Sequence, residues 1–128
     1  MIENSKKKSK LVNVTAYEVR LKSSVTGEEI YLPPSGVLIN AKIEDKVVHS
    51  NGHSDEDVTF IKKEYKTEEH TTARLEAIET ENPNCIVIGS IIAAQAYPGR
   101  VYALEPYTGF ERVPVANKIF FSDKFQVF

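Results

Sequence analysis

The chain has 128 residues, of which 41% are hydrophobic and 27% charged, with a formal net charge of −2 and a single cysteine. This length suffices for one hydrophobic core but hardly for two, so we expect a single β-rich domain over residues 11–128. No apolar run approaches the roughly 18 residues of a membrane span, and no signal-peptide pattern is present, which favours a cytoplasmic protein without a membrane partner. The lone Cys85 excludes an internal disulfide and a zinc cluster of thiolates, so the core alone must stabilise the fold.

Charge is segregated along the chain. Residues 1–10 contain four lysines and one glutamate, whereas residues 44–81 contain eleven acidic and five basic residues. The basic decapeptide has no aromatic residue among its lysines, which makes it a weak footprint for nucleic acid. We interpret residues 1–10 as a flexible, solubilising tail, and nucleic acid is not an expected partner.

The first strands follow from a period of two. Residues 17–22 alternate apolar and charged side chains, which predicts a half-buried strand. Thr26 and Gly27 supply a turn before a second short strand at residues 29–32. Pro33-Pro34-Ser35-Gly36 ends that strand, because two prolines remove backbone donors and the glycine can adopt a positive φ.

The middle of the chain continues the alternation. Residues 37–43 predict a third strand. Asn51-Gly52 is a hairpin signal between residues 46–50 and 58–65, although a polar run makes this connection longer than a two-residue turn. Residues 66–82 fit either an irregular segment or a short amphipathic helix, since the threonines favour strands whereas the alanines and a Leu/Ile pair suit a helix.

The segment after residue 82 contains a strand followed by a helix. Residues 85–88 are apolar at every position, which predicts a strand covered on both faces at the centre of the core. Gly89 and Ser90 follow directly. Residues 91–96 predict about two turns of helix, capped by Ser90 and ended before Pro98-Gly99.

Short strands are predicted at residues 101–104 and 113–115, with a turn at residues 106–109 between them. Residues 118–128 are too apolar to remain in water, so we expect this C-terminal strand to dock in the sheet or in a subunit interface. The predicted fold is mainly β, of the α+β class: an antiparallel meander with one short helix after a central buried strand.

Two stretches of the chain carry family-like motifs. The first runs from Leu11 through Asn13-Val14-Thr15-Ala16-Tyr17 to the Pro33-Pro34-Ser35-Gly36 turn, and the second is a hydrophobic strand, a serine, a short Ala-rich helix and Pro98-Gly99-Arg100. This pattern resembles a family of small uncharacterised proteins from phages, prophages and actinobacteria, which open on Asn-Leu-Thr-Pro-His. Ala16 and Tyr17 replace the Pro and His of that motif. The resemblance implies a phage or mobile-element setting, and hence the host-cell cytoplasm, but it implies no particular activity.

The reactive side chains do not form a catalytic set. His49, His53, Asp55 and Asp57 lie within nine residues, but they match no known metal-binding loop, so we expect a polar hairpin loop and neither metal nor cofactor. Cys85 should behave as a buried hydrophobic residue, because burial disfavours its thiolate. Ser90 lacks the Gly-x-Ser-x-Gly pattern and no histidine follows it, so the sequence does not indicate an enzyme.

The helix start at Gly89 and Ser90 presents free backbone N–H groups, an arrangement that binds anions. The segment that follows adds aromatic side chains that can stack on a base and arginines that can pair with phosphate. The candidate ligand-binding residues are therefore Gly89, Ser90, Tyr97, Arg100, Tyr102, Tyr107, Phe110 and Arg112. The alternative is that the aromatic residues belong to the core or an interface and that the arginines lie on the surface.

Two functional hypotheses follow. The first is a non-enzymatic, phage-type binding protein that forms a homo-oligomer and sequesters a small anionic ligand, such as a nucleotide signal of host defence. The second is a structural or interaction module, such as a virion accessory protein or an inhibitor that engages a host protein through the Phe-rich C-terminal strand. A chain of this length encloses little space alone, so we expect a neighbouring subunit to complete any site.

Overall fold

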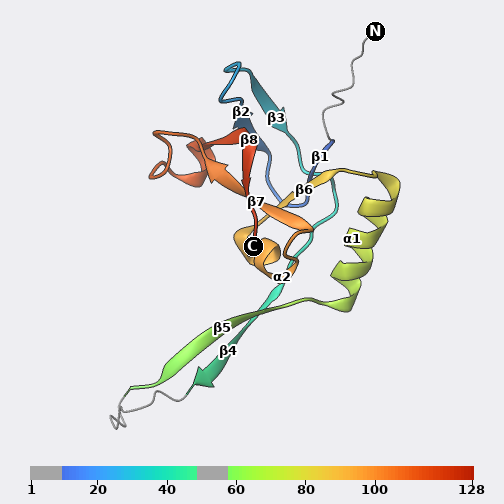
Figure 1. Ribbon diagram of the computed structural model, residues 1–128, viewed down its shortest axis with the longest axis vertical. Helices are drawn as coiled ribbons and strands as arrows, with labels where there is room; N and C mark the ends of the chain where they lie inside the picture. Colours follow the sequence, from blue (N-terminus) through green and yellow to red (C-terminus); the bar gives the residue numbers. More distant parts are fainter. Residues whose placement is uncertain (1–9, 49–57) are drawn as a thin grey trace.

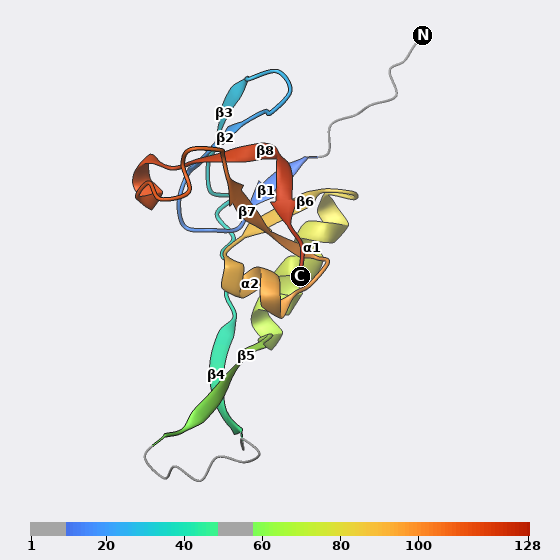
Figure 2. The ribbon, with the colours of Figure 1, turned by 60° about the vertical axis from the view of Figure 1, so that its left-hand side comes forward.

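The computed structural model describes residues 10–48 and 58–128, arranged as Figures 1 and 2 show. Within these ranges the strands are β1 (Leu11–Asn13), β2 (Val19–Lys22), β3 (Glu29–Leu32), β4 (Lys42–Val48), β5 (Phe60–Lys66), β6 (Ile86–Gly89), β7 (Val101–Pro106) and β8 (Ile119–Gln126). The helices are α1 (Glu69–Glu81), α2 (Ile91–Ala96) and the short 3-10 helix η1 (Val115–Asn117), and none of them is long and apolar enough to cross a membrane. Residues 1–9 of the predicted tail and the Asn51-Gly52 turn lie outside the described residues.

Six strands form one mixed sheet in the order β1-β6-β7-β8-β2-β3. The mainly β, α+β class predicted from the sequence is confirmed. The antiparallel meander describes only part of the sheet, because the pairs β1/β6, β6/β7 and β2/β8 are parallel, whereas β2/β3 and β7/β8 are antiparallel. A parallel pair needs a crossover connection, and α2 supplies one by carrying the chain from the end of β6 to the start of β7.

Strand β6 lies at the centre of the core, as its uninterrupted apolar sequence predicted. Val87 faces a cluster formed with α1 and α2, and Ile88 faces a second cluster that includes Leu21. Leu11 and Leu32, from the two end strands of the sheet, both pack against the second cluster. The sheet therefore curls around that cluster into a near-barrel.

The buried side chain of Asn13 joins the two ends of this curled sheet. Its Nδ2 donates to the carbonyl oxygens of Tyr17 at 2.7 Å and Leu32 at 3.1 Å. Its Oδ1 accepts the backbone N–H of Thr15 at 2.9 Å, and its own carbonyl accepts the N–H of Ser35 at 2.8 Å. Because β1 and β3 are the two ends of the strand order, these bonds tie opposite edges of the sheet together.

Three local predictions are confirmed. Ser90 caps α2, and β8 docks within the sheet between β7 and β2. The helical alternative for residues 66–82 is the correct one, because α1 occupies most of this segment. Its buried residues Thr71, Leu75 and Ile78 are spaced four and three positions apart, as one helix face requires. α1 is thus a second helix in addition to the one predicted.

Two predicted strands differ from the structure. Residues 37–41 connect the sheet to β4 without strand pairing of their own, and β4 begins only at Lys42. The alternation there arises because Ile39 is buried in the α1 and α2 cluster, while its N–H donates to Val14 O at 3.2 Å. Residues 113–115 lead into η1 instead of forming a strand, because Pro114 has no N–H for a ladder.

The β4–β5 hairpin is a separate two-stranded antiparallel sheet. Figures 1 and 2 show it extending away from the six-stranded sheet, on the side opposite to the β2–β3 hairpin. Its strands pair from Lys42 with Lys66 to Val48 with Phe60. The predicted hairpin is therefore confirmed, and the structure adds that it stands apart from the main sheet.

Candidate ligand-binding cavity

The helix start that the sequence suggested as an anion site uses its polar groups within the fold. Ser90 Oγ accepts the N–H of Ala93 at 3.0 Å, and α2 has only six residues. Gly89 is buried so tightly that a Cβ in its place would lie 2.7 Å from Val101 Cγ1. Both residues therefore have structural roles, one as a helix cap and the other as a point of close packing.

Tyr97 and Arg100 connect the end of α2 to α1. Tyr97 is 4% exposed, and its Oη lies 2.8 Å from the hydroxyl oxygens of both Thr71 and Thr72. Arg100 forms a two-pronged ion pair with Glu79, with Nε to Oε2 at 3.2 Å and Nη2 to Oε1 at 2.6 Å. The hydrogen bond and the charge of Glu79 raise the pKa of Arg100. The guanidinium that the sequence assigned to a phosphate thus has an internal carboxylate partner.

Replacing Tyr97 with phenylalanine tests this structural role. The buried Thr71 and half-buried Thr72 hydroxyls would lose their shared partner, although each still donates at 2.9 Å to Glu68 O. We therefore expect the free energy of unfolding to fall by about 1 kcal/mol. Tyr102→Phe is the matched control, because its Oη donates at 3.1 Å to Gly99 O at an exposed position. Urea denaturation of both variants should show a loss for Tyr97→Phe and little change for Tyr102→Phe. Equal effects would contradict the assignment.

The remaining candidates lie beyond the other end of β7. The ring centroid of Tyr107 is 4.7 Å from that of Phe121 on β8, and Phe110 closes a turn with its N–H bonded to Tyr107 O at 2.8 Å. Arg112 is exposed on the same connection. The structure therefore divides the predicted residues between the two ends of β7.

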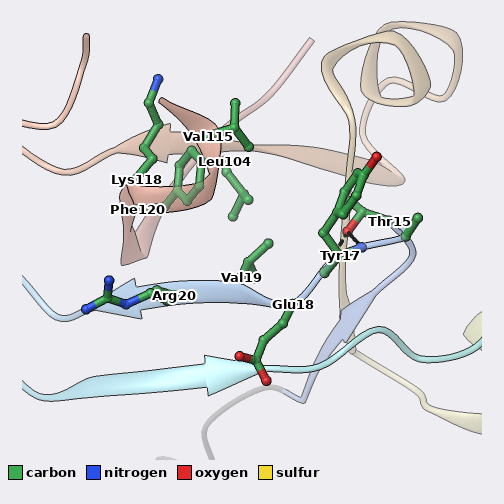
Figure 3. A pocket seen from close by; sticks show the side chains of 10 residues that line it. Thr15, Tyr17, Glu18, Val19, Arg20, Leu104, Val115, Lys118 and Phe120 are labelled. Atoms are coloured by element: carbon green, nitrogen blue, oxygen red, sulfur yellow. Dashed lines mark hydrogen bonds between the residues drawn. The ribbon is translucent and has the colours of Figure 1, made fainter. Parts of the chain in front are cut away.

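An open cavity of about 870 Å³ lies at one mouth of the curled sheet, between β2, β7, β8 and the β1–β2 connection (Figure 3). Val19, Leu104 and Phe120 form an apolar floor that is continuous with the inner core cluster. Cavities of roughly 300–1,000 Å³ at the mouths of curled β-sheets are common ligand sites. The full lining consists of Thr15, Ala16, Tyr17, Glu18, Val19, Arg20, Leu104, Val115, Lys118 and Phe120.

Two basic side chains lie on the same side of this cavity. Arg20 pairs across the sheet with Ile119, the neighbour of Lys118, and Figure 3 shows both cations on one side, with the Lys118 amine pointing away from Arg20. Arg20 Nη2 is 3.5 Å from a carboxylate oxygen of Glu29, and the guanidinium lies over the Tyr31 ring at 5.6 Å from its centroid. The buried Nε of Arg20 has no hydrogen-bond partner within the described part of the chain. Lys118 Nζ donates at 3.1 Å to the carbonyl of Glu111, which uses one of its three donors. Both cations therefore retain donor capacity.

Asn13 positions the other flank of the cavity. Its bonds to Thr15 and Tyr17 fix the β1–β2 connection, which places the Tyr17 ring across the cavity from the cations (Figure 3). The Glu18 carboxylate points toward β3, away from the apolar floor (Figure 3). The sequence did contain a signal for this site, because the polar Asn13 interrupts an apolar run and calls for buried partners.

Metal and thiol chemistry receive no support from the described residues. Residues 10–48 and 58–128 contain no group of three or more His, Cys, Asp or Glu side chains that could hold a metal. The predicted polar loop with His49, His53, Asp55 and Asp57 lies outside the described residues. Burial and the nearby Glu79 raise the pKa of Cys85, which disfavours the reactive thiolate.

The fold and the cavity define a small α+β protein whose mixed, curled sheet has an open cavity at one mouth. Comparisons with known protein families, with curated proteins and with solved structures found no match for the chain. The cavity and the exposed surface therefore carry the functional inference.

Proposed function

We propose that this chain is a non-enzymatic binding protein for a small anionic ligand with a flat apolar body. The observation that supports it most is the pairing of an apolar floor with two cations, Arg20 and Lys118, at one open cavity. Arg20 is the key residue, because its buried Nε has no partner in the described structure and its carboxylate contact is long. A polar group left unsatisfied in this way calls for an explanation, and an anionic ligand supplies one.

The lining sets the orientation of such a ligand. A ring lying between Tyr17 and Phe120 buries apolar surface on the floor, while its anionic group reaches the flank of Arg20 and Lys118. Each hydrogen bond to a charged group contributes about 1.5–3 kcal/mol, and an arginine can supply two in parallel. Because the cations lie at the open side, the cost of desolvating them is limited.

A nucleotide is the ligand class that combines these features, since it has a flat base and a phosphate. The resemblance to phage proteins favours a nucleotide signal of host defence, which a counter-defence protein can neutralise by stoichiometric binding. The proposed activity is binding without catalysis, because the Thr15 hydroxyl in the lining is already engaged in a hydrogen bond to Asn13 Oδ1 at 2.6 Å. We expect the protein to act in the host cytoplasm.

Thermal denaturation with mononucleotides and cyclic dinucleotides tests the proposal. A ligand that binds only the folded state raises the melting temperature with its concentration. Arg20→Gln should raise, by about tenfold or more, the ligand concentration needed for a given shift in melting temperature. The reason is that the substitution removes a charge-assisted bond. The melting temperature without ligand shows whether the variant is folded.

Arg112→Gln is the matched control, because it makes the same charge change at an exposed position outside the cavity. We expect the ligand-induced shift of this variant to equal that of the unmodified protein. A shift lost in Arg112→Gln and kept in Arg20→Gln would place the ligand with the residues predicted from the sequence. No shift with any nucleotide would rule out the nucleotide proposal.

A protein-interaction module is the second candidate function. The surface first suggested for it, the Phe-rich C-terminal strand, lies within the sheet as β8, where Phe121 is buried and Phe120 and Phe125 pack against the inner cluster. Exposed apolar side chains gather instead on the β4–β5 hairpin. This observation favours an interaction surface away from the cavity.

A further inference from the structure

The two faces of the β4–β5 hairpin differ in chemistry. Residues paired in an antiparallel ladder have side chains on the same face, so the register defines each face. We define the apolar face as the three cross-strand pairs Ile43/Tyr65, Asp45/Lys63 and Val47/Ile61. The charged face carries the like-charge pairs Lys42/Lys66, Glu44/Glu64 and Lys46/Lys62, followed by Val48/Phe60.

The apolar face is unusually exposed. Ile43, Val47 and Ile61 are 42%, 62% and 48% exposed, whereas Tyr65 is half-buried, and all four lie on one side of a two-stranded sheet. An isolated hairpin is only marginally stable in water, and it normally gains stability from a layer packed on its apolar face.

We propose that the apolar face packs against the same face of a second copy of this chain. The argument is charge complementarity at the central pair, where Lys63 Nζ lies 2.6 Å from Asp45 Oδ1. A two-fold axis parallel to the strands places each Asp45 over the Lys63 of the other copy. The same axis places Ile43 over Tyr65 and Val47 over Ile61, so apolar pairs meet on both sides of the charges.

The other surfaces of the hairpin are less suited to self-association. The charged face has like charges directly opposite each other, and its ion pairs run along each strand, from Lys42 to Glu44 at 3.2 Å and from Lys66 to Glu64 at 3.9 Å. The two-fold axis would place like charges of two copies over each other on this face, which opposes its self-association. Both strand edges carry lysines, including Lys46 on β4 and Lys62 on β5, and edge lysines oppose strand addition. The apolar face carries one negative and one positive charge side by side. The two-fold axis brings the opposite charge of the second copy over each of them.

The expected association is weak. Each strand has seven residues, so the hairpin is about 24 Å long and about 10 Å wide. Packing two such faces buries roughly 500 Å² in total, below the ~1,200 Å² at which stable interfaces begin. We therefore expect a monomer–dimer equilibrium that depends on protein concentration, whether or not the cavity binds a ligand.

Charge-reversal variants of the full chain test the pairing by sedimentation velocity. Asp45→Lys gives an apolar face with two positive charges, and Lys63→Asp gives one with two negative charges. Each variant alone should dissociate at least tenfold more readily than the unmodified chain. An equimolar mixture should associate, because each positive face then meets a negative one. A folding defect cannot produce this result, since mixing repairs no bond within a single hairpin.

Glu44→Lys and Lys46→Glu are the matched controls, because they make the same charge changes on the charged face. We expect both to dimerise as the unmodified chain does. An unmodified chain that stays monomeric at every concentration overturns the proposal. So does a mixture of the two reversal variants that fails to associate, or a control that dissociates as readily as Asp45→Lys.

Discussion

Asn13→Ala is expected to lower the free energy of unfolding by about 3 kcal/mol, a large loss for one polar side chain. Asn13 is 1% exposed, and its amide satisfies the carbonyls of Tyr17 and Leu32 together with the N–H of Thr15. Alanine leaves the Leu32 carbonyl and the Thr15 N–H without this partner, whereas the Tyr17 carbonyl keeps its bond from the Thr15 hydroxyl at 3.0 Å. It also releases the bond that joins β1 to the end of β3, so we expect the curled sheet to loosen at this edge.

Urea denaturation followed by circular dichroism measures this loss. Asn40→Ala is the control, because Asn40 is exposed on the segment before β4, and its replacement should change stability by less than about 0.5 kcal/mol. A second readout separates stability from the cavity. If Asn13 positions Tyr17, then ligand stabilisation should weaken in Asn13→Ala at temperatures where the variant is fully folded. An Asn13→Ala protein as stable as the control would contradict the role of this side chain.

The sequence was most informative where structure depends on neighbouring residues. The apolar run ending at Ile88 predicted a strand covered on both faces, and Ser90 predicted a helix start, because both signals are local. The parallel pairing of β1 with β6 joins segments more than seventy residues apart, and no local period specifies it. Strand positions could therefore be predicted, whereas the order of strands in the sheet could not.

The candidate site shows the same limit. Arg100 and several aromatic residues have the side chains of a nucleotide site, but the sequence cannot show that Glu79, twenty-one residues earlier, pairs with Arg100. The cavity draws Tyr17, Leu104 and Lys118 from distant segments, and only the curl of the sheet brings them together. Side-chain type indicates which chemistry is available, whereas the long-range fold decides which donors remain for a ligand.

Gly89→Ala is expected to destabilise the protein by about 2 kcal/mol through overpacking at the end of β6. The new Cβ would lie 2.7 Å from Val101 Cγ1 and 3.3 Å from Val14 Cγ2. Both valines are fully buried and β-branched, so neither can turn aside at low cost. The expected loss comes from steric overlap and not from backbone strain, because Gly89 is not among the glycines with a positive φ.

A double-mutant cycle with Val101→Ala distinguishes overpacking from other causes. Val101→Ala alone removes the obstructing methyl group and leaves a cavity, which should cost about 2 kcal/mol. In the double variant the Cβ at position 89 enters the space left by that methyl group. We therefore expect the double variant to be more stable than the sum of the two single losses predicts, by about 1 kcal/mol or more. Strict additivity in urea denaturation would show that the close approach of β6 to β7 does not require a glycine.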